Sequence, residues 1–322
     1  MVKKVRLGLY PLLLSVVVAC SDASETTTVE ADQPKTWTIG ESLDVETFLD
    51  CIEEKGMAVV SAHRGGPARF APENSIKAFK RTLEAAPALI EFDVATSADG
   101  VLYLMHDDTL DRTTTGSGAV TKNPWEMVRK YRLIDFNGRI INNPPPTLEE
   151  ALAYLKDKTI AQIDFKRTTK YEDVIDLVRR MDASHRVILI AYTTAQAQKL
   201  YRLAPEMKIS ASMELQSRLD EMIDVGIPPE NLVAFTGTRN VQPDMNNVFD
   251  RADVEVIFGT LGGARAIDKD IAANGNEERY ASIAAAGVDI IATDRPLAAY
   301  SALKSAGRAP GDGVCGISGP KQ

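Results

Sequence analysis

The chain has 322 residues, of which 44% are apolar and 25% charged, with three histidines and three cysteines. This composition is typical of a soluble globular protein, and the length suits one large α/β domain or two small ones. The formal net charge of −8 at pH 7 excludes a general electrostatic attraction to nucleic acid, so we expect no nucleic-acid partner.

The first residues predict an export signal. The basic "MVKKVR" precedes the apolar run "LGLYPLLLSVVVA", which is shorter than the roughly 20 residues of a membrane span. The following "VVAC" resembles a bacterial lipoprotein lipobox, which implies that residues 1–19 are removed as a signal peptide and that Cys20 is lipidated. The alternative is an ordinary signal peptide followed by an incidental cysteine.

The two ends of the remaining chain are predicted to be flexible. Residues 20–40 are polar and are expected to form a lipid-anchored linker, and the glycine-rich residues 307–322 a loose tail. Lipidation would hold the protein at the cell envelope. Ser21 after the cysteine resembles outer-membrane sorting, on the periplasmic face, in an organism that has an outer membrane.

Two further cysteines, Cys51 and Cys315, fit either of two states. In an oxidising compartment they could form a disulfide. Two unpaired thiols are equally compatible, because the sequence does not give the distance between them.

The membrane, through the anchor, is the expected partner, and no protein partner is implied.

Short apolar runs alternate with helical patterns across the expected domain, residues 41–306. The runs are 57–62, 88–94, 101–106, 159–165, 186–192, 208–213, 231–235, 255–259 and 288–293. Such alternation predicts a parallel sheet. The linker "ATSADG" between the second and third runs is too short for a parallel crossover and suits a hairpin. If the third run is counted as the return arm of a hairpin on strand 2, the nine runs leave eight parallel strands. This predicts a (β/α)8 TIM barrel, with an insertion at about 107–146 after strand 2.

Ionisable residues gather where these runs end, and the carboxyl ends of barrel strands are where active sites lie. They are His63, Arg64, Glu91, Asp93, His106, Asp164 and Lys166. Glu91 and Asp93 share one strand face, where their repulsion calls for a shared proton or a cation. With Asp164 they suit one divalent cation, Mg²⁺ or Ca²⁺. Separate salt bridges are the alternative.

The two histidines at this rim suggest a general acid and a general base. Arg64 and the adjacent glycines suit a phosphate. His185 instead precedes a strand, at the opposite end of the predicted barrel, and is assigned no role.

Four blocks of the sequence stand out, in the order "SAHRGGPARFAPENS", "IEFDVATSADGVLYLMHDDTLDRTTTGSG", "PPPTLEEAL" and "GVDIIATDRP". Together they resemble the motifs of the glycerophosphodiester phosphodiesterase family. The resemblance spans about residues 57 to 300 and implies a TIM barrel with a small insertion after strand 2. Several ordered blocks are far more specific than one short motif.

The resemblance implies a role for each matching residue. His63 and His106 would be the general acid and base, Arg64 and Lys166 would face the phosphate, and the metal ligands would be Glu91, Asp93 and Asp164. Asp164 stands where the family usually has Glu. Phe258 stands where it tends to have Trp, so Phe258 is expected in the substrate pocket. Asn74 would brace the loop after strand 1, or would cap a helix.

The expected function is metal-dependent hydrolysis of glycerophosphodiesters to glycerol 3-phosphate and an alcohol. The family implies attack by the adjacent glycerol hydroxyl, followed by opening of a cyclic phosphate by water. One alternative is phospholipase D-like action on intact phospholipids, against which we count the lack of an obvious apolar loop at the rim. Another is a non-catalytic lipoprotein that binds phosphodiesters.

Overall fold

The computed structural model describes residues 36–40 and 44–320. The expected signal peptide, Cys20 and most of the expected linker lie outside the described residues. The described residues belong to one compact unit. Within them, no helix is both long and apolar enough to cross a membrane.

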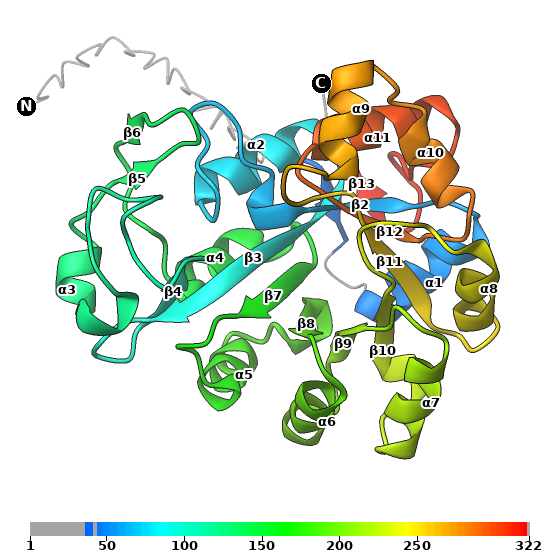
Figure 1. Cartoon of the computed structure of the whole chain (residues 1–322), viewed down its shortest axis with the longest axis horizontal. Helices are drawn as coiled ribbons and strands as arrows, with labels where there is room; N and C mark the ends of the chain where they lie inside the picture. Colours follow the sequence, from blue (N-terminus) through cyan, green and yellow to red (C-terminus); the bar gives the residue numbers. More distant parts are fainter. Residues whose placement is uncertain (1–35, 41–43, 321–322) are drawn as a thin grey trace, which may run out of the picture. The chain divides into compact units, whose positions relative to one another are not determined.

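The centre of the fold is a closed barrel of parallel strands (Figure 1). Its strands are β2 (Val59–Ala62), β3 (Ala88–Thr96), β7 (Ala161–Phe165), β8 (Val187–Ala191), β9 (Lys208–Ser212), β10 (Leu232–Phe235), β11 (Glu255–Gly259) and β12 (Ile290–Thr293). Each pairs with the next, and β2 closes the ring by pairing with both β12 and β3. The expected TIM barrel is confirmed.

The predicted hairpin follows β3. Strand β4 (Leu102–Leu104) runs antiparallel to β3 and places Leu104 opposite Val94. The insertion after it contains a 3-10 turn (Val120–Lys122), α3 (Trp125–Val128) and the strand pair β5 (Leu133–Ile134) and β6 (Ile140–Ile141). It buries its own small apolar cluster, formed by Ala95, Tyr103, Met105, Leu110, Val120 and Val128.

Amphipathic helices cover the outside of the barrel, as Figure 1 shows for α5, α6 and α7. They are α2 (Ile76–Ala85), α4 (Leu148–Leu155), α5 (Tyr171–Arg180), α6 (Thr194–Leu203), α7 (Ser217–Asp224), α8 (Pro243–Asp250), α9 (Ile267–Asn274), α10 (Arg279–Ala284) and α11 (Pro296–Ser305). Helix α4 begins with a capping box between Thr147 and Glu150. Its apolar face, which includes Leu152, packs into the main core.

The amino-terminal end of the barrel is covered by a helix and by two short strands that lie in segments we expected to be flexible. Helix α1 (Val45–Glu54) lies there with β1 (Thr38–Ile39), which pairs antiparallel with β13 (Ile317–Ser318). A disulfide joins Cys51 to Cys315, with their Cα atoms 5.6 Å apart. The expectation of flexibility is therefore corrected for residues 36–40 of the linker and residues 307–320 of the tail. Ile39 and Ile317 are buried in the apolar cluster at this end, which fixes both segments.

Candidate active site

Three carboxylates meet at the carboxyl end of two neighbouring barrel strands. Glu91 and Asp93 lie on β3, and Asp164 lies on β7 directly opposite Asp93. All three are buried, and one oxygen from each lies within 4.8 Å of the others. The structure thus brings together the three residues that the sequence predicts as ligands of a cation.

Asp93 is held by neutral and cationic donors. The Asn74 side chain donates to Asp93 Oδ2 at 2.7 Å and accepts from the Asp93 backbone N–H at 3.0 Å. Lys166 Nζ lies 2.5 Å from Asp93 Oδ1. Burial works to raise the pKa of Asp93, but Lys166, Arg64 and His106 together hold it below its usual range. Helix α2 is capped by Ser75, so Asn74 braces the carboxylate rather than capping the helix.

One carboxylate oxygen of Asp164 accepts hydrogen bonds and the other accepts none from the described residues. Its Oδ2 accepts from Lys166 Nζ at 2.7 Å and from the Tyr192 hydroxyl at 2.8 Å. Its Oδ1 is buried and has no hydrogen-bond partner among the described residues. A buried carboxylate oxygen without a donor is costly unless a cation binds it. Burial also raises the pKa of Asp164, as does the charge of Asp93.

The third carboxylate completes this acceptor set. Burial and the negative charge of Asp93 raise the pKa of Glu91, whose Oε2 accepts a 2.6 Å hydrogen bond from the Arg64 backbone N–H. Oxygen donors of this kind are those that Mg²⁺ and Ca²⁺ prefer. The residues present therefore fit a hard divalent cation.

His63 follows β2 in a tight turn and is oriented by an aspartate from the far end of the chain. Its Nδ1 lies 2.7 Å from Asp294 Oδ1. Burial works to lower the pKa of His63, but the hydrogen bond to Asp294 and the charge of Glu91 outweigh it, so the pKa is raised. Asp294 was not predicted from the sequence to belong to the site. Its place directly after β12, at the same rim, was the available signal.

His106 has an equivalent arrangement. Its Nδ1 lies 2.7 Å from Asp107 Oδ1. Arg112 donates from Nε to Asp107 Oδ2 at 2.6 Å and from Nη1 to Glu73 Oε2 at 2.8 Å. Glu73 in turn accepts from Arg64 Nη1 at 2.9 Å. A continuous chain of charge-assisted hydrogen bonds thus links His106 to the loop that carries His63. Asp107, Arg112 and Glu73 were likewise not predicted from the sequence to belong to the site.

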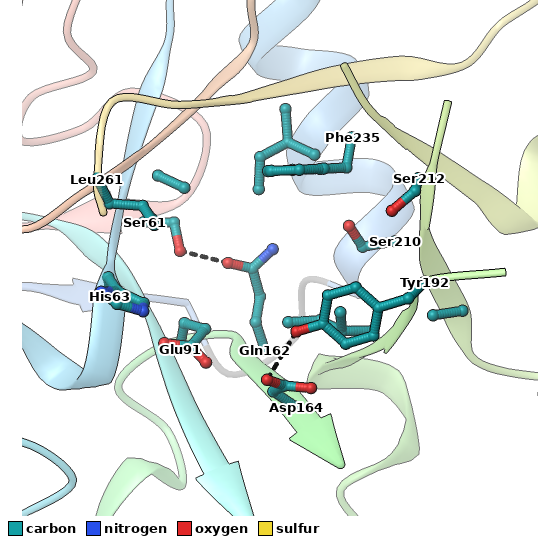
Figure 2. A pocket seen from close by; sticks show the side chains of 14 residues that line it. Ser61, His63, Glu91, Gln162, Asp164, Tyr192, Ser210, Ser212, Phe235 and Leu261 are labelled. Atoms are coloured by element: carbon teal, nitrogen blue, oxygen red, sulfur yellow. Dashed lines mark hydrogen bonds between the residues drawn. The ribbon is translucent and has the colours of Figure 1, made fainter. Parts of the chain in front are cut away.

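A cavity of about 180 Å³ opens in the barrel mouth beside these groups (Figure 2). Its lining is Ser61, His63, Glu91, Gln162, Asp164, Ile190, Ala191, Tyr192, Ser210, Ser212, Phe235, Ile257, Leu261 and Ala292. Figure 2 shows Gln162 in the middle, hydrogen-bonded to Ser61, with Tyr192 reaching Asp164. The site therefore combines a polar face with an apolar wall.

Phe258 does not line this cavity, so the expectation that it binds substrate is corrected. Successive residues of a strand face opposite sides. Ile257 faces the cavity, whereas Phe258 is fully buried in the core between the strands and the helices. Phe235, from β10, and Tyr192 contribute aromatic rings to the cavity wall.

Comparison with known proteins gives a family match over this region. The model of the glycerophosphoryl diester phosphodiesterase family matches residues 63–223. A glycerophosphodiester phosphodiesterase of Caldanaerobacter subterraneus is 33% identical over 47% of this chain and 65% of its own length. A probable glycerophosphodiester phosphodiesterase 2 of Mycobacterium tuberculosis is 31% identical over 49% of this chain and 57% of its own. The match thus covers less than two thirds of either relative.

Solved structures resemble the chain over more of its length. A glycerophosphoryl diester phosphodiesterase of Parabacteroides distasonis superposes with a TM-score of 0.77 at 31% identity, covering 88% of this chain and 99% of the other. A phosphodiesterase of Oleispira antarctica, solved with the product sn-glycerol-3-phosphate, has a TM-score of 0.58 at 18% identity, covering 77% and 97%. The second likeness concerns the fold alone.

Proposed function

Because this chain belongs to the glycerophosphoryl diester phosphodiesterase family, we propose that it hydrolyses glycerophosphodiesters to glycerol 3-phosphate and an alcohol. The observation that carries the proposal is that the acidic residues and the two histidines are arranged together at the barrel rim. Three buried carboxylates converge beside His63 at the barrel rim, and both rim histidines bind an aspartate through Nδ1.

Glu91, Asp93 and Asp164 would hold one divalent cation, Mg²⁺ or Ca²⁺. When bound, such an ion neutralises negative charge on phosphoryl oxygens. Arg64 and Lys166 add fixed positive charge next to the same carboxylates, which favours an anionic phosphodiester over a neutral ester.

The histidines would move the protons. In each histidine the aspartate accepts a hydrogen bond from Nδ1–H, so the neutral ring has its unprotonated nitrogen at Nε2. Nε2 is therefore the atom that can take up or give a proton. One histidine takes the proton from the attacking hydroxyl, and the other protonates the departing alkoxide. Asp294 and Asp107 keep the two rings in this tautomer and orientation.

The direct test measures release of glycerol 3-phosphate from a panel of glycerophosphodiesters. His63→Ala and His106→Ala should each lower kcat by about 10² or more. His185→Ala is the matched control, because His185 is exposed in the turn before β8 and should leave kcat unchanged. Substrate binding without product in the unaltered protein would instead favour the non-catalytic alternative.

A second candidate function, action on intact phospholipids, has one observation in its favour. Contrary to our expectation from the sequence, loops near the rim carry exposed apolar side chains. Phe70, Phe136 and Ile140 are 48%, 71% and 64% exposed, and Asp135 joins their two loops by accepting from the Phe70 N–H at 3.0 Å. Comparing kcat/KM for an intact phospholipid and for its deacylated form decides between the two functions. The first proposal expects the deacylated form to be preferred.

We also propose that the protein is anchored at the cell envelope through Cys20. The signal-like sequence supports this, and the disulfide between Cys51 and Cys315 is typical of an oxidising compartment. Full-length protein should enter the membrane fraction of the producing cells, and Cys20→Ser should release it from that fraction.

A further inference from the structure

An open groove lies on the barrel rim next to the candidate active site. It is about 600 Å³ in volume and lies between the loop after β10, with Thr238 and Arg239, and the loop after β11, residues 261–267. It continues into a second hollow of about 620 Å³. The charged residues that line this hollow are the cations Arg239, Arg265, Lys269 and Arg279 and one carboxylate, Asp270. Four cationic side chains thus share one connected surface.

Within the described residues, only Arg279 of these four cations is paired with a carboxylate. Arg239 and Arg265 are both exposed, and no carboxylate pairs with either among residues 36–40 and 44–320. Arg279, in contrast, lies 2.6 Å from Asp270. In a protein with a net charge of −8, two unpaired guanidinium groups facing one hollow form a local site of attraction for an anion.

The groove begins where the catalytic cavity ends. Leu261 lines both of them, and Figure 2 shows Leu261 beside Ser61, on the His63 side of the cavity. The next residue, Gly262, donates its backbone N–H to Asp294 Oδ2 at 3.2 Å. Since Asp294 also binds His63, the loop that carries Arg265 is attached to the carboxylate that orients a candidate catalytic residue.

On the basis of the proposed function, we propose that this groove binds a second anionic group, a phosphate or a carboxylate, on the alcohol part of the substrate. The cavity of about 180 Å³ has room for only a small part of the diester, such as glycerol. The other part must leave the cavity, and past Leu261 it meets Arg239 and Arg265. Arginine forms paired hydrogen bonds with both phosphate and carboxylate groups.

The test uses two matched substrate pairs. Glycerophosphoglycerol and bis(glycerophospho)glycerol differ by a second phosphodiester, and glycerophosphoethanolamine and glycerophosphoserine differ by a carboxylate. We expect kcat/KM to be about five- to tenfold higher for the member with the additional anion, after correction for the two scissile bonds of bis(glycerophospho)glycerol. A preference in the first pair identifies a phosphate as the ligand, and a preference in the second identifies a carboxylate.

Arg239→Gln with Arg265→Gln should make kcat/KM equal within each pair, and 0.5 M NaCl should have the same effect on the unaltered protein. Arg218→Gln removes one exposed cation of α7 that pairs with Glu221 and should keep the preference. Equal kcat/KM values in the unaltered protein would overturn the inference while leaving the proposed function intact. The inference would also be overturned if the double variant changed kcat/KM only for phospholipid vesicles and for none of the four soluble diesters. No hydrolysis of any of the four substrates would overturn both.

Discussion

Nδ1 of His63 lies 2.7 Å from Oδ1 of Asp294, although 231 positions separate the two residues in the chain. The barrel makes this contact possible because β2 and β12 are neighbours in the closed sheet. The residues that follow the two strands therefore meet at the same rim. The first prediction concerns this pair.

Asp294→Asn should lower kcat by about 10² to 10⁴, because the uncharged amide no longer stabilises a positively charged imidazole or fixes its tautomer. The hydrogen bond to Asp294 also raises the pKa of His63. The limb of the pH–rate profile that reports His63 should therefore move to lower pH in this variant. Asp224→Asn, an exposed change at the end of α7, is the control. An unchanged kcat with an unchanged profile would contradict the assigned orientation of His63.

Tyr192 should position a metal ligand. Its hydroxyl and Lys166 occupy Asp164 Oδ2, which leaves Oδ1 for a cation. Tyr192→Phe should weaken Mg²⁺ or Ca²⁺ binding about 10- to 100-fold, as is usual when a hydrogen bond to a ligand is lost. Isothermal titration measures this without reference to activity. Tyr201→Phe, in α6, should bind the ion normally, and equal affinities in all three proteins would show that Tyr192 has no part in the site.

The disulfide should be a large contribution to stability. It links residues 264 positions apart and so restricts the unfolded chain strongly. Cys51→Ser with Cys315→Ser should lower the free energy of unfolding by about 2–4 kcal/mol in urea titrations. Reduction of the unaltered protein should give the same loss. Turnover should be unchanged, since the bond lies at the end of the barrel opposite the active site. Equal urea midpoints for the unaltered protein and the double variant would rule out a stabilising role.

Stability should fall as the pH rises toward neutrality. Burial raises the pKa of Glu255 to about 7, against the opposing charge of Lys208, and raises that of Asp289 to about 6. For Glu255, between the unfolded pKa of about 4.5 and the folded pKa of about 7, the native state keeps a proton that the unfolded chain has lost. The free energy of unfolding should therefore decrease from pH 5 to pH 7.5.

Urea midpoints across this range measure the slope. Glu255 pairs with Lys208 Nζ at 3.2 Å, and both side chains are buried. Replacing the pair with Glu255→Gln and Lys208→Met should flatten the slope without leaving a lone buried charge. A midpoint that rises with pH in the unaltered protein would show that the carboxyl groups ionise more readily in the fold than burial suggests.

Local patterns predicted the architecture well, and long-range contacts account for what was missed. The alternation of apolar runs and the short "ATSADG" turn indicated the barrel and its hairpin, because strand period and turn length are local properties. The contacts of Tyr192 with Asp164 and of Arg112 with Glu73 join side chains from segments that are separate in the sequence. The pairing of β1 with β13 joins opposite ends of the described chain, and no local signal indicates it.

The error on Phe258 has a different origin. It was placed by analogy with an aromatic position of the family, whereas strand alternation determines which residues of β11 face the cavity. Ile257 lines the cavity, and Phe258 therefore points to the helices. Alternation places Val256 and Phe258 together on the face opposite Ile257, and both are buried in the main core.

The central claim, that Glu91, Asp93 and Asp164 hold a cation required for phosphodiester hydrolysis, is tested most directly by one titration. Protein stripped with EDTA is supplied with increasing Mg²⁺ or Ca²⁺ while release of glycerol 3-phosphate from glycerophosphocholine is recorded. We predict no turnover without the ion, saturable recovery with one equivalent bound, and no recovery in Asp93→Asn. Full turnover in the presence of EDTA, or normal recovery in Asp93→Asn, would contradict the account.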